Sequence, residues 1–412
     1  MPTRRDVLLA GLGAPMTAAL ASATRRPISM RAVVVGAGAF GGWTALNLVR
    51  RGAAVTLIDA WGPGNVRASS GGETRVIRAT YGTRAVYTAL AARALAMWRE
   101  HDERFQRGFF KKTGAIWLFG GDDAFGRASA AALAAHALPH EWLSPAEAAT
   151  RYPQFSYDGI GSVLYEPEAG YLLARRACEH VAERVAAEGG TVRAASAATP
   201  VRINGGPLRR IALDDGTALE ADVFVFACGP WLGQLFPDVI GNRVKPTRQE
   251  VYYFGTPAGD GRFSEARLPV WVDFGERLIY GIPGNANRGF KVADDTPGAA
   301  FDPTNGSRDI TREGAAAARA FLARRFPALA KAPLLGGEVC QYEASPDSHF
   351  IVDRHPGAEN VWIAGGGSGH GFKMGPALGE VLAATVLGAP LPANDWSLAR
   401  FKAGALPVEK WS

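Results

Sequence analysis

Residues 31–60 read RAVVVGAGAFGGWTALNLVRRGAAVTLIDA. This stretch opens and closes on short, almost continuous apolar runs, which are typical of buried parallel strands. Between them lie a glycine-rich turn and a segment whose apolar residues recur at helical spacing. The stretch therefore predicts a strand, a turn, a helix and a second strand, the repeating unit of a doubly wound α/β domain.

Three glycines, Gly36, Gly38 and Gly41, form a GxGxxG pattern at the predicted turn. Small residues there let a pyrophosphate approach the helix N-terminus, whose N–H groups and dipole favour an anion. Asp59 ends the second predicted strand, where a carboxylate can accept hydrogen bonds from an adenosine ribose. Because an acid at this position disfavours the extra phosphate of NADP, the pattern predicts FAD or NAD.

A second glycine turn lies near the other end of the chain. Residues 360–388 read NVWIAGGGSGHGFKMGPALGEVLAATVLG and predict an apolar strand, a glycine turn and a helix from about Gly375. Residues 221–233, ADVFVFACGPWLG, predict a further strand that ends near Gly229. Two distant glycine turns favour FAD, whose ring lies far from its adenine, although the second run taken alone is equally typical of an ordinary loop.

Length and composition limit the classes of protein. A chain of 412 residues is longer than one typical core, which predicts two domains. The net charge is +6, but the basic residues are scattered, which argues against a nucleic-acid partner. The three cysteines have neither a disulfide framework nor zinc-like spacing, so no metal site is predicted.

The first residues, MPTRRDVLLAGLGAPMTAALASATRRP, contain a twin arginine followed by a mildly apolar stretch and small residues. This pattern resembles a twin-arginine export signal over residues 1–23. The apolar stretch is too short and too weak to span a bilayer, so no stable membrane insertion is expected. The pattern predicts a periplasmic or secreted protein; the alternative is a cytoplasmic protein that begins at Met30.

Alternating apolar residues predict strands and hairpins in three further segments, residues 110–121, 248–257 and 270–284. The alanine-rich stretches ASAAALAAHAL and GAAAARAFLARRF predict helices. We expect these segments to form a second domain, whose sheet covers the cofactor.

Four motifs carry a resemblance to a known family: SSGGETRVIRATYG (69–82), RGFKVADD (288–295), CQYEASPDSHFIVD (340–353) and GSGHGFK (367–373). With them, the sequence resembles the monomeric sarcosine oxidase and N-methyltryptophan oxidase family, within the D-amino-acid-oxidase-like FAD superfamily. The resemblance covers nearly the whole chain after residue 31. The fold class it implies is α/β with an α+β second domain: a Rossmann-like FAD-binding domain (31–105, 160–244 and 336–412) interleaved with an antiparallel-sheet substrate-binding domain (106–159 and 245–335).

The resemblance also implies which residues hold the cofactor. The cysteine that matches Cys340 is bonded through sulfur to the 8α-methyl group of the flavin, which predicts covalent FAD here; the alternative is an unreactive buried thiol. The implied cofactor-binding residues are Gly36, Gly38, Gly41, Asp59, Ser69, Thr74, Arg75, Gly229, Cys340, Gly367, Gly369, His370 and Gly371.

Two arginines, Arg75 and Arg78, stand three apart, a spacing that places both on one face if the segment is helical. By resemblance, Arg78 and Lys373 bind the substrate carboxylate, since a guanidinium can clamp a carboxylate in bidentate geometry. Arg75 lines the flavin and is grouped with His370 among the catalytic residues. The plainer alternatives are an arginine pair on a solvated helix face and a histidine and lysine on a surface loop.

The third catalytic residue implied is Lys291, which matches a lysine that promotes the reaction of reduced flavin with dioxygen. A strand lysine that points to solvent is the alternative. Asp295 stands where sarcosine oxidase has a cavity histidine, so its charge predicts a changed substrate range that favours a distal cation. Tyr342 is expected to line the substrate cavity or else to pack in the core.

Together these features predict FAD-dependent oxidation of the C–N bond of a secondary amino acid, N-substituted or cyclic, to an imine. Dioxygen reoxidises the flavin and yields hydrogen peroxide. The expected partners are a small amino-acid or amine substrate and O2, and the protein is expected to be a monomer. Two alternatives stay open: a dehydrogenase that passes electrons to a quinone or carrier, and a non-catalytic flavin-binding assembly protein.

Overall fold

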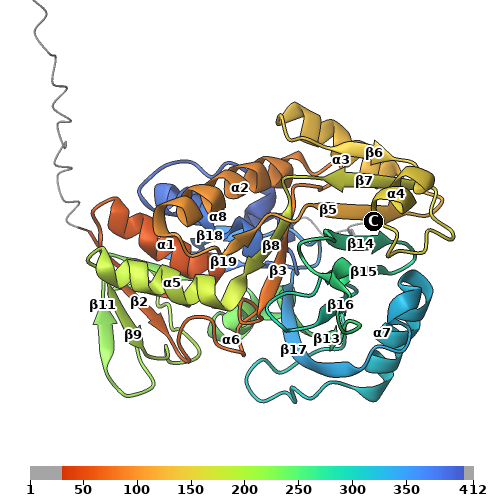
Figure 1. Ribbon diagram of the computed structural model, residues 1–412. Coiled ribbons are helices and arrows are strands. Elements are labelled where there is room, and N and C mark those ends of the chain that lie inside the picture. The colour runs from red at the N-terminus through yellow and green to blue at the C-terminus, as the bar shows by residue number, and fades with distance from the viewer. Residues whose placement is uncertain (1–29, 403–412) are drawn as a thin grey trace, which may run out of the picture.

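The computed structural model describes residues 30–402 (Figure 1). The predicted export signal at residues 1–23 lies outside this range. Within it, none of the helices combines the length and the apolar composition needed to cross a bilayer.

A six-stranded sheet forms one half of the molecule (Figure 1). Its strand order is β18-β19-β12-β1-β2-β9, and every neighbouring pair is parallel except β18 and β19. The strands are β1 (Arg31–Val35), β2 (Ala54–Asp59), β9 (Thr191–Ala194), β12 (Val223–Phe226), β18 (Ile351–His355) and β19 (Ala358–Gly365). Helix α1 (Ala39–Arg50) joins β1 to β2, which confirms the predicted strand–turn–helix–strand unit.

The two faces of this sheet bury different layers. One face packs against α1 and three other helices: α2 (Ala85–Phe105), α5 (Ala174–Ala187) and α8 (Gly375–Val386). The other face packs against α6 (Leu232–Leu235) and the hairpin β10 (Arg210–Ala212) and β11 (Ala218–Glu220). Successive side chains of β1 point to opposite faces of the sheet. Ala32 and Val34 pack against the helices, whereas Val33 and Val35 pack on the face with the hairpin. Both faces are therefore covered, as the continuous apolar runs predict.

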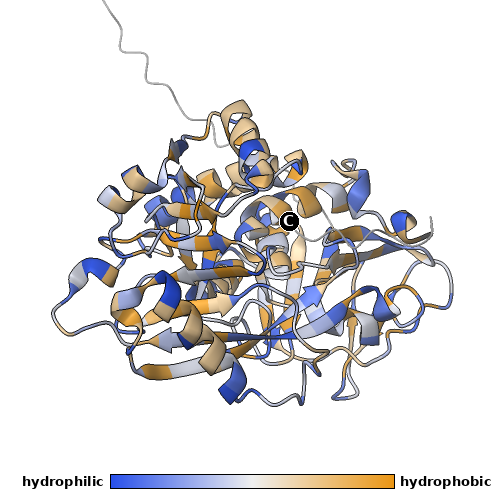
Figure 2. Cartoon of the chain, turned by 90° about the vertical axis from the view of Figure 1, so that its right-hand side faces the viewer, coloured by the Kyte–Doolittle hydropathy of each residue, from blue (hydrophilic) through white to orange (hydrophobic). Residues whose placement is uncertain are grey.

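An eight-stranded, largely antiparallel sheet forms the other half, in the order β17-β13-β16-β15-β14-β5-β7-β6. One of its strands, residues 115–119 (AIWLF), is apolar and buried throughout, whereas hydrophobic and hydrophilic residues are mixed over the chain as a whole (Figure 2). Its strands are β5 (Ala115–Phe119), β6 (Glu141–Leu143), β7 (Ser162–Glu166), β13 (Lys245–Phe254), β14 (Val270–Phe274), β15 (Leu278–Ile282), β16 (Phe290–Asp294) and β17 (Leu334–Ala344). Around it lie α3 (Ala124–Ala135), α4 (Pro145–Arg151) and α7 (Arg312–Arg325).

Both alanine-rich helices are confirmed, as α3 and α7, and so are the strands expected around residues 110–121, 248–257 and 270–284. Two strands of the eight-stranded sheet, β7 and β17, extend into ranges that the sequence analysis assigned to the FAD-binding part. The chain leaves the eight-stranded sheet only after these strands, in the short segments 167–169 and 345–350.

A small three-stranded sheet, β3-β8-β4, contains the arginine motif. Its strands are β3 (Thr74–Ile77), β4 (Phe110–Lys111) and β8 (Gly170–Leu173). The helical placement considered for Arg75 and Arg78 is therefore wrong: Arg75 lies in β3 and Arg78 directly follows it. Residues three apart along an extended chain point to opposite sides, so the two guanidinium groups have different surroundings.

The glycine turn after β1 depends on close backbone packing. Gly36 has φ +103°, and a Cβ there would overlap the carbonyl oxygen of Ala227 at the end of β12. A Cβ at Gly41 would overlap the carbonyl oxygen of Gly36 itself. Only glycine at these two positions allows α1 to begin directly against the sheet edge.

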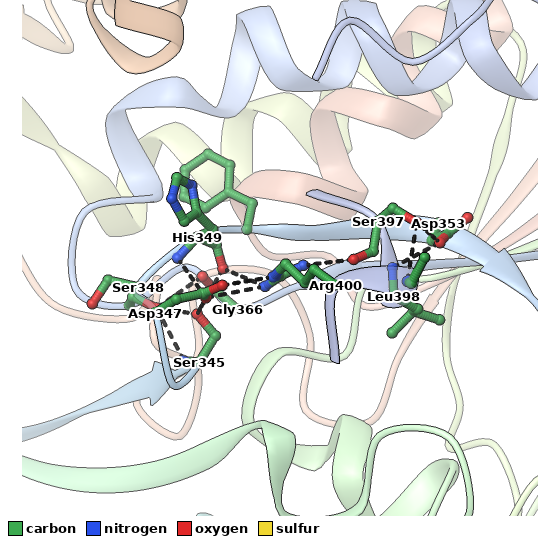
Figure 3. A network of polar contacts seen from close by, with 12 residues as sticks. Ser345, Asp347, Ser348, His349, Asp353, Gly366, Ser397, Leu398 and Arg400 are labelled. Carbon is green, nitrogen blue, oxygen red and sulfur yellow. Dashed lines mark hydrogen bonds and ion pairs between the residues drawn. The ribbon is translucent and has the colours of Figure 1, made fainter. Parts of the chain in front are cut away.

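The C-terminal segment stabilises the second glycine turn through the loop 345–349 (Figure 3). Arg400 pairs with Asp347 at 2.8 Å in the loop 345–349, and both side chains are about 10% exposed. The backbone N–H of Ser345 in this loop donates to Oγ of Ser368, a residue of the glycine turn, at 3.1 Å. The ion pair therefore fixes the loop that holds the glycine turn.

We expect Arg400→Ala to lower the free energy of unfolding by about 3 kcal/mol, because it leaves the Asp347 carboxylate buried without its cation. Burial alone would raise the pKa of Asp347, but the bond from Arg400 lowers it. A carboxyl group whose pKa is lowered on folding stabilises the folded state at a pH above its unfolded-state pKa. This stabilisation is lost as the pH falls through the folded-state pKa, so the loss of stability caused by Arg400→Ala should be smaller in acid. Urea unfolding at pH 7 and pH 3.5 measures both effects.

The matched control is Arg127→Ala, which breaks the 2.8 Å pair with Asp123 in which the arginine side chain is 71% exposed. This variant should lose less than about 1 kcal/mol. Equal losses in the two variants at pH 7 would contradict the account of the C-terminal segment.

Candidate active site

A cleft of about 1160 Å³, its mouth included, runs along the carboxyl edge of the six-stranded sheet. Open α/β sheets bind ligands at this edge, because the loops that follow the parallel strands diverge there. Its lining includes Gly36 and Gly38 from the first turn, Gly229 after β12, and Gly367 and Gly369 after β19. The three strand ends expected from the sequence thus meet in one cleft.

Asp59 lies at the end of β2 and lines the cleft. Its Oδ2 accepts a hydrogen bond of 2.8 Å from the backbone N–H of Ala37, and Oδ1 accepts one of 3.0 Å from Trp61. Burial raises the pKa of Asp59, while these backbone bonds act in the opposite direction. The backbone therefore fixes this carboxylate beside the glycine turn, where an adenosine ribose would lie.

A second, smaller cavity adjoins the cleft. Both are lined by Arg75, Tyr342 and Gly369, and the second is also lined by Cys340 and Tyr280. A bound molecule can therefore extend from Asp59 past the glycine turns to Cys340. This sequence of lining residues fits a flavin dinucleotide, with adenosine towards Asp59 and the ring towards Cys340.

Cys340 faces this second cavity from β17. Its sulfur accepts a hydrogen bond of 3.0 Å from the Arg75 guanidinium, which also donates to the Ser69 carbonyl oxygen at 2.8 Å. The thiol therefore lies beside a cation at a cavity wall.

Lys291 lies on β16 and is 1% exposed. Its Nζ donates to the carbonyl oxygen of Thr74 at 3.0 Å and lies 5.9 Å from the ring centre of Tyr280. Burial, together with the nearby charge of Arg75, lowers the pKa of Lys291 to about 7. The alternative of a solvent-facing strand lysine is therefore wrong, and the amine lies next to the residues that line the second cavity.

Arg78 and Lys373 meet at Tyr81. The Arg78 guanidinium lies 4.5 Å from the ring centre of Tyr81, and Lys373 Nζ donates to the Tyr81 hydroxyl at 3.0 Å. Lys373 also donates to the backbone carbonyl of His370 at 2.9 Å. Burial lowers the pKa of Lys373 well below its usual range, and the charge of Arg78 adds to this effect. Arg78 and Lys373 therefore share a site with little water, and an anionic ligand there would favour the charged form of the lysine.

An acid faces these cations from the eight-stranded sheet. Asp295 follows β16, and its Oδ1 accepts a hydrogen bond of 2.6 Å from the hydroxyl of Tyr342. Burial raises the pKa of Asp295 to about 6, against the lowering effects of Tyr342, Arg78 and Lys373. Since Tyr342 lines both cavities, it connects the acid to the cleft, and core packing is not its role.

His370 takes a different position from the one expected. Its ring stacks on Phe350 with centroids 4.9 Å apart, and Nε2 donates to the carbonyl oxygen of Ser348 at 3.0 Å. Burial lowers the pKa of His370 well below its usual value, so the ring is neutral. The side chain is not among those that line the two cavities described above, and it is the backbone carbonyl that contacts Lys373.

The structure therefore sorts the predicted residues into groups. The cleft is lined by Gly36, Gly38, Asp59, Ser69, Arg75, Gly229, Tyr342, Gly367, Gly369 and Gly371. Thr74 and Lys291 contact each other beside Cys340 and Arg75, whereas Arg78, Lys373 and Asp295 form the charged cluster. Gly41 is not part of the cleft lining but packs against the backbone of Gly36 in the first glycine turn.

Sequence analysis missed Glu166, Tyr280 and Glu343. Glu166 is buried and accepts hydrogen bonds of 2.9 Å from the Ala79 backbone N–H and from Trp117 Nε1, so it anchors the segment after Arg78. The signal for Glu343 is its position within the quoted motif CQYEASPDSHFIVD, directly after Tyr342. No local pattern distinguishes Glu166 or Tyr280, because strand pairing alone brings them here.

The comparisons agree with this geometry. The family model described as FAD dependent oxidoreductase (DAO) matches residues 31–385, and the chain belongs to this family. Monomeric sarcosine oxidase of Bacillus sp. (strain B-0618) is 31% identical over 365 residues, covering 86% of this chain and 91% of that protein. N-methyl-L-tryptophan oxidase of Yersinia pestis (strain Pestoides F) is 29% identical over 377 residues, covering 90% and 99%.

Among solved structures, L-proline dehydrogenase from P. horikoshii shares the fold with a TM-score of 0.79 and 21% identity, covering 92% of this chain and 100% of that one. The protein is thus an FAD-dependent oxidoreductase with the predicted mixed α/β fold. The residues fit the cofactor, since the glycine turns, Asp59 and the second cavity provide for its phosphates, its ribose and its ring.

We expect Gly369→Ala to reduce the amount of flavin bound per chain by more than half. Gly369 has φ +80°, and a Cβ there would lie 2.6 Å from the ring of Tyr342, where the two cavities meet. The ratio of flavin to protein absorbance measures the effect. The control is Gly388→Ala, a position with φ +104° and open space around it after α8, which tests backbone strain alone. Full flavin content in Gly369→Ala would contradict the placement of the flavin between Asp59 and Cys340.

Proposed function

We propose that this enzyme oxidises the C–N bond of a secondary amino acid, N-substituted or cyclic, to an imine. The observation that carries the proposal is the charged cluster beside the cleft, where Arg78 and Lys373 meet at Tyr81 and Asp295 faces them. An amino acid carries a carboxylate, and Arg78 and Lys373 can complement its negative charge. The similarity to sarcosine and N-methyltryptophan oxidases supports the same class of donor.

The substrate carboxylate binds to Arg78 in bidentate fashion and to Lys373 as a point charge. Tyr81 holds both cations in place through its ring and its hydroxyl. Bound FAD supplies the acceptor for the two electrons of the C–N bond. Fixing the carboxylate fixes the C–H bond relative to the cleft, and such positioning supplies much of the rate. The two cations also favour the neutral, oxidisable form of the amine.

Asp295 sets the substrate range in this proposal. Its carboxylate adds a negative charge beside Tyr342, so a substrate with a second basic group is favoured. The charge is present above a pKa of about 6 and disappears as the pH falls through it.

Anaerobic mixing with N-methylated lysine and with sarcosine tests the substrate class through loss of the oxidised-flavin absorbance. Both should bleach the flavin, and the dissociation constant of the dibasic substrate should rise several-fold between pH 7.5 and pH 5.5. Asp295→Asn should remove this pH dependence while the variant still bleaches with sarcosine. If only primary amino acids bleach the wild-type flavin, the substrate class is wrong.

We propose that dioxygen is the electron acceptor and that Lys291 promotes its reduction. The buried amine lies beside the second cavity, where its positive charge stabilises the negative charge that dioxygen gains. Lys291→Met should slow reoxidation by O2 at least 100-fold and change flavin reduction by substrate less than fivefold, as measured by stopped flow. Equal effects on the two half-reactions would contradict this role, and slow air oxidation of the wild type would favour a quinone or a carrier.

We propose that FAD is attached covalently through Cys340. The support is the position of the sulfur at the wall of the second cavity, at the ring end of the cleft. Acid precipitation should leave the flavin in the protein pellet of the wild type and release it from Cys340→Ser. Release from both proteins would contradict the bond.

We further propose an exported monomer, on the basis of the twin-arginine pattern and of the similarity to a monomeric relative. The N-terminal sequence of the protein purified from its native host decides between processing near residue 23 and a start at Met30. Light scattering gives the oligomeric state.

A further inference from the structure

Glu343 is a buried acid that the proposed reaction does not use. It lies on β17 directly after Tyr342, is 8% exposed and lines the cleft. Its Oε1 accepts a hydrogen bond of 3.1 Å from the backbone N–H of Gly367. Within residues 30–402, Oε2 has no hydrogen-bond partner. Burying an oxygen without a hydrogen-bond partner lowers the stability of the fold. A ligand in the cleft that hydrogen-bonds to Oε2 would remove this penalty.

The glycines of two strand ends make room for this carboxyl group. A Cβ at Gly229 would lie 2.5 Å from Oε2, and one at Gly367 would lie 2.6 Å from Oε1. Side chains at these positions would push the carboxyl group away from the cleft. The site is therefore shaped around Glu343 from both sides.

Strand order identifies the part of the cofactor that Glu343 faces. Along the carboxyl edge, the cleft passes from Asp59 after β2 to Gly36 after β1, then to Gly229 after β12 and Gly367 after β19. The ribose binds at the first position and the pyrophosphate at the second, beside the N-terminus of α1. Glu343 stands over the third and fourth, between the phosphates and the ring cavity. The ribityl chain of FAD, a run of hydroxyl groups, spans this interval.

We propose that Glu343 is a cofactor-binding residue whose neutral carboxyl group donates a hydrogen bond from Oε2 to a ribityl hydroxyl of FAD. The inference concerns cofactor binding alone and does not depend on the proposed substrate or acceptor.

The chemistry of the site supports a neutral carboxyl group. Burial raises the pKa of Glu343 to about 7, and the N–H of Gly367 lowers it only in part. Oε1 then accepts from Gly367 while Oε2 carries the proton. A glutamine has the same shape and the same arrangement, with an oxygen that accepts and an N–H that donates.

The test is a titration of flavin-free, full-length protein with FAD, followed by quenching of flavin fluorescence. All variants carry Cys340→Ser so that binding stays reversible. We expect Glu343→Ala to weaken FAD binding at least tenfold and Glu343→Gln to stay within threefold of the parent. Glu338→Gln makes the same chemical change on the same strand at a residue that lines neither described cavity, and it should have no effect.

Titration with ADP separates a ribityl contact from a general disturbance of the cleft. ADP contains the adenosine and the pyrophosphate but no ribityl chain, so its affinity should change less than threefold in Glu343→Ala. Three results would overturn the proposal: unchanged FAD affinity in Glu343→Ala, equal loss in Glu343→Gln, or equal loss of ADP and FAD affinity. Because no substrate is present and no flavin is reduced, none of them bears on the proposed reaction.

Discussion

The close backbone approach at the carboxyl edge of the six-stranded sheet is the constraint on which the rest of the site depends. Gly36 and Gly41 let α1 begin against the end of β12, and the turns after β12 and β19 open onto the same edge. The eight-stranded sheet reaches this edge through β17, which bears Cys340 and Tyr342. A cofactor laid along the edge would therefore touch both halves of the molecule.

Burial gives the charged groups of the site their chemical properties. It lowers the pKa values of Lys291 and Lys373 and raises that of Asp295, because each loses the water that stabilises its charged form. The Arg78 guanidinium lies 4.5 Å from the ring centre of Tyr81. The result is a site whose cations and acid lie apart from bulk solvent, so a substrate carboxylate interacts with them strongly.

The nucleotide-binding half could be predicted from the sequence because its signals are local. The glycine pattern, the apolar runs and Asp59 follow one another within thirty residues, and all of them adopt the expected structure. The site on the other half could not be derived in this way. Helical spacing suggested one face for Arg75 and Arg78, but pairing with β8 makes the segment a strand. Glu166 reaches Arg78 only through sheet pairing, which no local pattern encodes.

The central claim is that Arg78 and Lys373 bind the substrate carboxylate beside the flavin. A crystal structure of the FAD-loaded protein with an inert carboxylate, such as methylthioacetate, tests it most directly. The account predicts the carboxylate oxygens within 3.2 Å of both the Arg78 guanidinium and Lys373 Nζ, in line with charge-assisted hydrogen bonds. A carboxylate bound elsewhere in the cleft, with Lys373 still bonded only to Tyr81 and the His370 carbonyl, would contradict it.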